Sequence, residues 1–197
     1  MTGAGGGGVG LVGLHAAAAK VGAWCWAERR CFELLGAWVR EAEDPMVKAM
    51  VSVHSRHHAW RAQRWEEILP RAYAKPAGDL IVASADAEAF EFLDQLQPIG
   101  NRLAGHYHVL YPALLEAYEA SPVLMSPLSD GPALRATRII LGDGRQDLEE
   151  AKSVSGQWPG GISDPDHLTH LRHLVAKTQV NGGNSGDATT VFQRWGS

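Results

Sequence analysis

Cysteines and long apolar runs are scarce in this chain, and each scarcity excludes a class of protein. Only two of the 197 residues are cysteines, Cys25 and Cys31. They lie on one expected helix at a spacing that keeps their sulfurs apart, so no disulfide is expected between them. A reduced, cytoplasmic protein fits this usage. The apolar runs are far shorter than the roughly 20 residues that a membrane-spanning helix needs.

A large excess of one charge sign is missing as well. The formal net charge is −4, and charged residues make up 20% of the chain. Without a basic surplus, neither nucleic acid nor an anionic membrane is an expected partner. The glycine-rich residues 1–10 lack the basic flank and apolar segment of a secretory signal, and we expect a flexible leader there. Residues 11–178 are expected to form one domain, and the polar residues 179–197 a mobile tail.

Alternating strand patterns and internal repeats are missing too, and helical periodicity fills most of the chain. Asp44-Pro45 is typical of a cap followed by a first-turn proline, and Pro98 and Pro112 are expected to kink or break the third helix. The expected helices cover approximately residues 11–42, 45–69, 86–119, 130–151 and 164–177. The predicted fold class is therefore all-α: a four-helix bundle with a short additional C-terminal helix, whose aromatic-rich face suits a homodimer.

One carboxylate stands on the expected apolar face of the first helix. Val21, Cys25, Glu28, Phe32 and Leu35 recur in steps of three and four, as positions on one helix face do. Burying Glu28 without a partner would cost several kcal/mol, roughly, so it should meet a partner or a ligand.

The second helix brings histidine and arginine to the same level. Its expected inner line holds His54, His57, Arg61 and Trp65, with His58 one step to the side. An antiparallel hairpin sets Glu28 opposite approximately position 60, within one turn of His57, His58 and Arg61.

The other two long helices add polar residues to this interior. On the third helix His106 falls on the apolar line, and on the fourth helix Arg138 lies between Leu134 and Leu141. Asp143 and Asp147 are less clearly placed by the pattern. Together the four helices predict an interior that is polar at mid-height.

Two segments carry a resemblance to a known family. Arg30-Cys-Phe-Glu-Leu-Leu-Gly-Ala-Trp38, followed by His57-His-Ala-Trp-Arg-Ala-Gln-Arg-Trp65 and Leu69-Pro70, resembles small bacterial proteins of the ferritin-like superfamily. The resemblance covers approximately residues 15–150 and implies a ferritin-like four-helix bundle.

The same resemblance implies a metal centre that this sequence matches incompletely. Di-iron members of the superfamily use a Glu on each of two helices and Glu-x-x-His on the other two. Here the second helix has His54-x-x-His57 instead, and the fourth helix has no such motif. Bridging carboxylates are missing, so an intact di-iron centre is not expected.

Three functional hypotheses follow. The first is a small-molecule enzyme of bacterial metabolism, including secondary metabolism, that needs no cofactor. Its expected catalytic residues are Glu28, His57, His58 and His106, and its expected substrate-binding residues are Arg61, Arg138, Trp60 and Trp65. The second is an iron-dependent oxygenase or oxidase that acts on a small organic substrate, with Glu28, His57 and His106 as ligands. The third is a non-catalytic bundle that binds a ligand or partner, in which the same residues form a structural network.

Overall fold

The computed structural model describes residues 9–69, 77–84, 86–121, 131–158, 160 and 165–184. Helices make up most of these ranges, and no strand occurs within them, which confirms the all-α prediction. The expected leader and tail fall largely outside the described residues. No helix in the described ranges combines the length and the apolar character that crossing a membrane requires.

The helical elements follow one another with short connections. In chain order they are α1 (Val9–Trp38), α2 (Pro45–Glu67), η1 (Ala77–Leu80), α3 (Ala87–Gln95), α4 (Ile99–Gly105), the π-helical η2 (His106–Leu110), α5 (Tyr111–Ala120), α6 (Gly131–Val154), η4 (Ser155–Gln157) and α7 (Pro165–Asn184).

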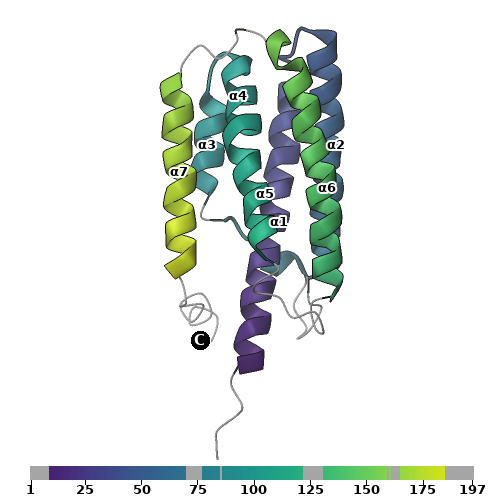
Figure 1. Ribbon diagram of the computed structural model, residues 1–197, viewed down its shortest axis with the longest axis vertical. Coiled ribbons are helices and arrows are strands. Elements are labelled where there is room, and N and C mark those ends of the chain that lie inside the picture. Colours follow the sequence, from purple (N-terminus) through teal and green to yellow (C-terminus); the bar gives the residue numbers. More distant parts are fainter. Residues whose placement is uncertain are drawn as a thin grey trace, which may run out of the picture.

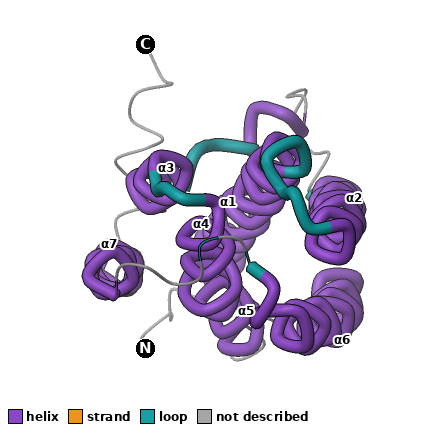
Figure 2. The backbone as a smooth tube through the Cα atoms, turned by 90° about the horizontal axis from the view of Figure 1, so that it is seen from above, coloured by secondary structure: helices purple, strands orange, loops and turns teal. Residues whose placement is uncertain are grey.

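The long helices lie side by side along the long axis of the molecule (Figure 1). Seen from above, α1, α2, α6 and α5 stand around one interior, while α3 and α7 lie to one side of them (Figure 2). Helix α2 packs against both α1 and α6, α5 packs against α6, and α7 contacts α3 and α4.

The turn between α1 and α2 follows the sequence prediction. Asp44 caps α2, because its Oδ1 accepts hydrogen bonds from the backbone N–H groups of Met46 (2.8 Å) and Val47 (3.0 Å). Pro45 is the first helical residue. A backbone N–H at this position would have no acceptor within the helix, so proline loses no hydrogen bond there. The cap thus fixes where the antiparallel α1–α2 hairpin turns.

The third expected helix is divided. A break occurs at Pro98, as predicted, since α3 ends at Gln95 and α4 begins at Ile99. At Pro112 the helix continues instead, and the π-helical η2 precedes the proline, with the N–H of Tyr111 donating to the carbonyl of His106. A wider turn of this kind is a common device at functional sites. Here it carries His106 with its side chain buried.

Two apolar clusters fill the interior at different heights. One gathers around the α1–α2 turn and contains Cys31, Val51 and Leu110, and the other contains Cys25, Ala62 and Ile140. On α2 the buried polar residues His54, His58 and Arg61 fall between Val51 of the first cluster and Ala62 of the second. Likewise, Glu28 lies between Cys25 and Cys31 on α1. The predicted polar band at mid-height is therefore present.

The predicted inward positions of Phe32 and Arg138 are wrong. Phe32 is 43% exposed, and the buried face of α1 runs through Cys25, Glu28 and Cys31 instead. Arg138 is exposed as well. The buried residues of α6 are Thr137, Ile140, Gly144, Asp147 and Ala151. Most of these are small or polar, so a search for apolar residues selects a neighbouring face.

The small residues on α6 have a steric cause. A Cβ added at Gly144 would lie 2.4 Å from the hydroxyl oxygen of Tyr111 on α5. Tyr111 therefore packs directly against the backbone of α6, and only glycine fits there.

Candidate functional site

Glu28 is fully buried and has two partners. Its Oε2 lies 2.6 Å from Nδ1 of His58 on α2. Its Oε1 accepts a hydrogen bond of 2.8 Å from the hydroxyl of Tyr118 on α5. The inward-pointing carboxylate predicted from the sequence is thus confirmed, and two other helices, α2 and α5, supply its partners.

Burial shifts both members of the Glu28–His58 pair toward their neutral forms. It raises the pKa of Glu28 to about 7, although the charge of Arg61 and the hydrogen bond from Tyr118 act in the opposite direction. It lowers the pKa of His58 well below its usual value, and the charge of Arg61 lowers it further.

Near neutral pH the pair therefore exists in two states, one with a single proton and one with two. When Glu28 is protonated, its O–H donates to the Nδ1 lone pair, and Nε2 of His58 carries the ring proton. When Glu28 is ionised, Nδ1–H donates to the carboxylate, and Nε2 presents a lone pair. The state of Glu28 thus decides whether Nε2 is a donor or an acceptor.

The ring of His58 meets two further aromatic rings, and each of the three has a polar atom without a partner in the described part of the chain. These atoms are Nε2 of His58, Nε2 of His106 and the hydroxyl oxygen of Tyr111. The ring of His58 lies 4.8 Å from that of Tyr111 and 5.3 Å from that of His106, and His106 stacks on Tyr111 at 5.4 Å. Buried polar atoms are normally satisfied, so these three atoms have hydrogen-bonding capacity that the described residues leave unused.

Arg61 places a permanent positive charge in the same interior. It is fully buried, its Nε donates to Asp143 Oδ2 at 2.8 Å, and an Nη donates to Asp147. Burial lowers the pKa of Arg61, but the nearby negative charges, first among them Glu28, more than offset this, and the net shift is upward. Its guanidinium group also lies over the ring of Tyr111, 5.3 Å from the centroid.

Asp147 is the meeting point of α2 and α6. Its Oδ1 lies 2.8 Å from Nδ1 of His57 and 3.6 Å from Nε2 of His54. The same Nε2 lies 3.2 Å from Oε2 of Glu150, while Nδ1 of His54 lies 2.9 Å from the hydroxyl of Tyr107. Burial lowers the pKa of His54, which favours a neutral imidazole.

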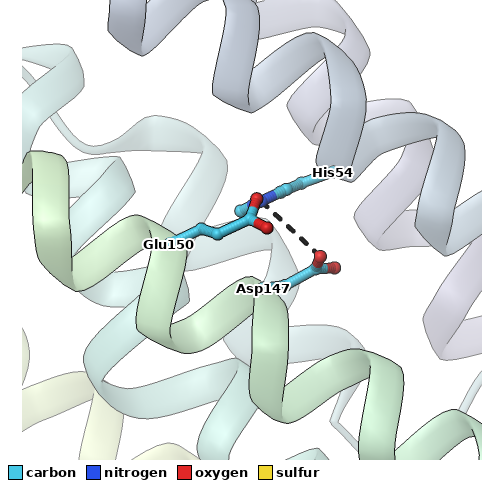
Figure 3. A group of neighbouring side chains, drawn as sticks. All are labelled: His54, Asp147 and Glu150. Carbon is cyan, nitrogen blue, oxygen red and sulfur yellow. Dashed lines mark hydrogen bonds and ion pairs between the residues drawn. The ribbon is translucent and has the colours of Figure 1, made fainter.

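Two overlapping groups around Asp147 could hold a metal ion. One is His54, Asp147 and Glu150, drawn in Figure 3, and the other is His57, Asp143 and Asp147. Within each group the ligand atoms all lie within 4.8 Å of one another. In the described part of the chain, neither group of this kind includes Glu28 or His106.

The predicted site residues divide into those that meet and those that do not. Glu28, His58, Arg61 and His106 come together in the interior. His57 pairs with Asp147 instead of Glu28, and its side chain is 38% exposed. Arg138 and Trp60 are exposed, so neither lines the interior as expected.

Trp65 occupies the core instead of a substrate pocket wall. It is fully buried, with its ring 4.9 Å from that of Trp24 and 5.2 Å from that of Tyr118.

The residues present do not fit a di-iron centre. Glu28 is engaged by His58 and Tyr118, and the guanidinium of Arg61 lies between the carboxylates of α6, where it would repel a second cation. The expected ligand set of Glu28, His57 and His106 does not form one metal-binding group either.

Several site residues received no role from the sequence. Tyr111 and Tyr118 stand seven apart, which sets them on one helix face, and both are buried. Asp143 and Asp147 stand four apart on α6 and both reach Arg61. These spacings were available in the sequence. They carry little weight there because tyrosine and aspartate are common on solvent-exposed faces.

Comparison with known proteins gives no assignment of the site. The chain matches no family model, no curated protein and no solved structure.

Proposed function

We propose that this chain is a ferritin-like enzyme of bacterial metabolism in which the buried Glu28–His58 pair moves a proton to or from a small organic substrate. The observation that carries the proposal is the 2.6 Å contact between Glu28 Oε2 and His58 Nδ1. On the far side of the same ring, Nε2 has no partner among the described residues. A carboxylate that orients an imidazole and leaves its second nitrogen free is a recurrent general-base arrangement.

The proton path follows from the two states of the pair. With Glu28 ionised, Nε2 of His58 accepts a proton from the substrate while Nδ1–H passes its proton to the Glu28 carboxylate. The imidazole ends neutral and Glu28 ends protonated. The reverse sequence returns the proton. A pKa of about 7 for Glu28 keeps both directions accessible near neutral pH.

Arg61 acts as a positioning residue in this scheme. One Nη lies 3.4 Å from Nδ1 of His58, so its positive charge disfavours a long-lived imidazolium and directs the proton on to Glu28. Because Arg61 is held by Asp143 and Asp147, we do not assign it to substrate binding.

The same group of rings suggests the chemistry of the substrate. We infer that Nε2 of His106 contacts a hydroxyl or carbonyl group next to the bond that loses or gains the proton. The ferritin-like assignment is supported by the all-helical fold, the α1–α2 hairpin and the polar band at mid-height.

Metabolite profiling tests this function across many candidate substrates at once. The purified protein is incubated with a bacterial metabolite extract, and untargeted mass spectrometry follows which compounds are consumed and formed. We expect at least one substrate–product pair whose conversion falls roughly 100-fold in Glu28→Gln, in line with loss of a general base.

Glu33→Gln is the matched control, because Glu33 is exposed on the same helix and pairs only with Arg30 among the described residues. It should convert the same compounds at the wild-type rate. A folded Glu28→Gln variant that keeps its turnover, or a wild-type protein that converts nothing, would contradict the proposal.

Metal-dependent oxidation of a small organic substrate, with iron as the metal, is the second candidate function. It is favoured by the two His/carboxylate groups around Asp147. Metal analysis of protein purified without chelators tests it, and a content well below one ion per chain contradicts it.

A further inference from the structure

A group of metal-ligand side chains lies apart from the Glu28–His58 pair. Asp147 and Glu150 stand three apart on α6, and His54 faces them from α2 (Figure 3). Nε2 of His54 lies 3.2 Å from Glu150 Oε2 and 3.6 Å from Asp147 Oδ1. One nitrogen and two carboxylate oxygens from two rigid helices thus converge on one point.

These separations suit ligands of one ion. Nitrogen and oxygen ligands that each lie about 2.1 Å from a tetrahedral Zn²⁺ are about 3.4 Å from each other. This distance falls between the 3.2 Å from His54 to Glu150 and the 3.6 Å from His54 to Asp147. We propose that His54 Nε2, Asp147 Oδ1 and Glu150 Oε2 bind a single divalent first-row transition-metal ion. Imidazole together with carboxylate favours such ions over Mg²⁺ or Ca²⁺.

Neighbouring groups orient the ligands. Nδ1 of His54 lies 2.9 Å from the hydroxyl oxygen of Tyr107, which can accept Nδ1–H and so leave the Nε2 lone pair free for the ion. Oδ2 of Asp147 accepts a hydrogen bond from Arg61, and Oδ1 faces both His54 and His57. Both ligands therefore have the outer hydrogen bonds that metal sites usually have.

Charge and access also fit. Asp143 and Asp147 pair with Arg61, and Glu150 adds a third carboxylate beside His54, so a dication reduces the negative excess at the α2–α6 contact. His54 and Asp147 are buried, whereas the side chain of Glu150 is 47% exposed. The ion can thus enter from the Glu150 side, where water can complete its coordination.

The overlapping group of His57, Asp143 and Asp147 fits less well. Nδ1 of His57 lies 2.8 Å from Asp147 Oδ1, well short of the separation of about 3.4 Å between two ligands of one tetrahedral ion. Arg61 pairs with two of the three ligands of this group, Asp143 and Asp147, but with only one ligand of the first group, Asp147.

The metal site is independent of the proton-transfer proposal, because neither Glu28 nor His58 is a ligand. It supplies a location for the second candidate function. It also differs from the Glu and Glu-x-x-His arrangement of di-iron proteins, since all its ligands come from α2 and α6.

Titration of chelator-treated protein with Co²⁺ and Zn²⁺ tests the site. Calorimetry counts the ions, and the visible absorption of bound Co²⁺ reports its coordination. We expect one ion per chain, and binding about tenfold weaker or worse in Glu150→Ala and in His54→Ala. Glu149→Ala, an exposed neighbour on the same helix, and His170→Ala, an exposed histidine of α7, should bind as the wild type does.

Glu28→Gln should also keep wild-type metal binding, so failure of the metal site and failure of the proton-transfer function are distinguishable. Because Glu150 is half exposed, its substitution tests the ligand without threatening the fold. An unchanged Co²⁺ spectrum and affinity in Glu150→Ala, or no bound ion in the wild type, would overturn the proposal.

Discussion

Oε2 of Glu28 and Nδ1 of His58 lie 2.6 Å apart, with both side chains fully buried. Burial raises the pKa of Glu28 from 4.5 to about 7. Between these values the native protein keeps a proton that the unfolded chain has released. The contribution of Glu28 to stability is therefore unaffected below pH 4.5, decreases as pH rises toward 7, and stays low above it.

Replacing Glu28 should remove this pH dependence. One pKa unit corresponds to 1.36 kcal/mol, so Glu28 alone should lower the free energy of unfolding of the wild type by about 3 kcal/mol between pH 4.5 and 7. Glu28→Gln should lack this decrease, and Glu33→Gln should retain it. Urea unfolding of the three proteins at several pH values measures the difference, and parallel curves for Glu28→Gln and the wild type would refute the assigned shift.

Three buried histidines should make the protein sensitive to acid. Burial is the main cause that lowers the pKa values of His54, His58 and His106 below 6.5. Below pH 6.5 the unfolded chain binds protons that the native protein does not, so the free energy of unfolding decreases as the pH is lowered.

His106→Phe should reduce the acid sensitivity, since it removes one of these groups and an Nε2 without a partner among the described residues. We expect a smaller drop in Tm between pH 7.5 and pH 5 than in the wild type. His170→Phe, at an exposed position, should leave the drop unchanged. A drop as large as that of the wild type in His106→Phe would count against a neutral, buried His106.

Tyr118→Phe should raise the pKa of Glu28 further. The hydroxyl of Tyr118 donates to Glu28 Oε1 and favours the ionised carboxylate. Its loss should also cost about 1–3 kcal/mol of stability. Tyr107→Phe is the control, because its hydroxyl contacts His54 instead. A ¹³C NMR titration of the Glu28 carboxyl measures the shift, and a midpoint that moves down or stays in place in Tyr118→Phe contradicts the contact.

Removing one member of the Arg61–Asp147 pair should be strongly destabilising. Arg61→Met leaves Asp147 buried without its counter-ion, which typically costs 3–5 kcal/mol, roughly. Adding Asp147→Asn should recover part of that loss, so a double-mutant cycle should show coupling. Arg145→Met, which breaks an exposed pair with Glu119, should cost about 1 kcal/mol or less. Additive effects of Arg61→Met and Asp147→Asn would contradict a direct pair.

Much of the fold was predictable because its signals are local. The cap at Asp44, the break at Pro98 and the inward position of Glu28 each follow from a few neighbouring residues. The π-helical turn before Pro112 was not predictable, because it depends on how η2 packs between its neighbours.

The site was predicted only in part. Glu28, Arg61 and His106 were found because each lies on the inner line of its own helix, and His58 was found because it lies one step beside such a line. Arg138 was misplaced because the buried face of α6 holds Gly144 and Asp147 instead of large apolar residues. Such a face is recognisable only when Tyr111 and Arg61, from two other helices, are placed against it.

The most direct test of the central claim is an NMR titration of Glu28 and His58 in the same sample. Carboxyl ¹³C and ring ¹⁵N resonances are followed from pH 5 to pH 9 and assigned with Glu28→Gln. We predict that the Glu28 carboxyl titrates near pH 7, and that Nε2 of His58 changes from a protonated to an unprotonated nitrogen in the same step. A Glu28 midpoint near 4.5, or a His58 ring that does not respond to it, would contradict the account.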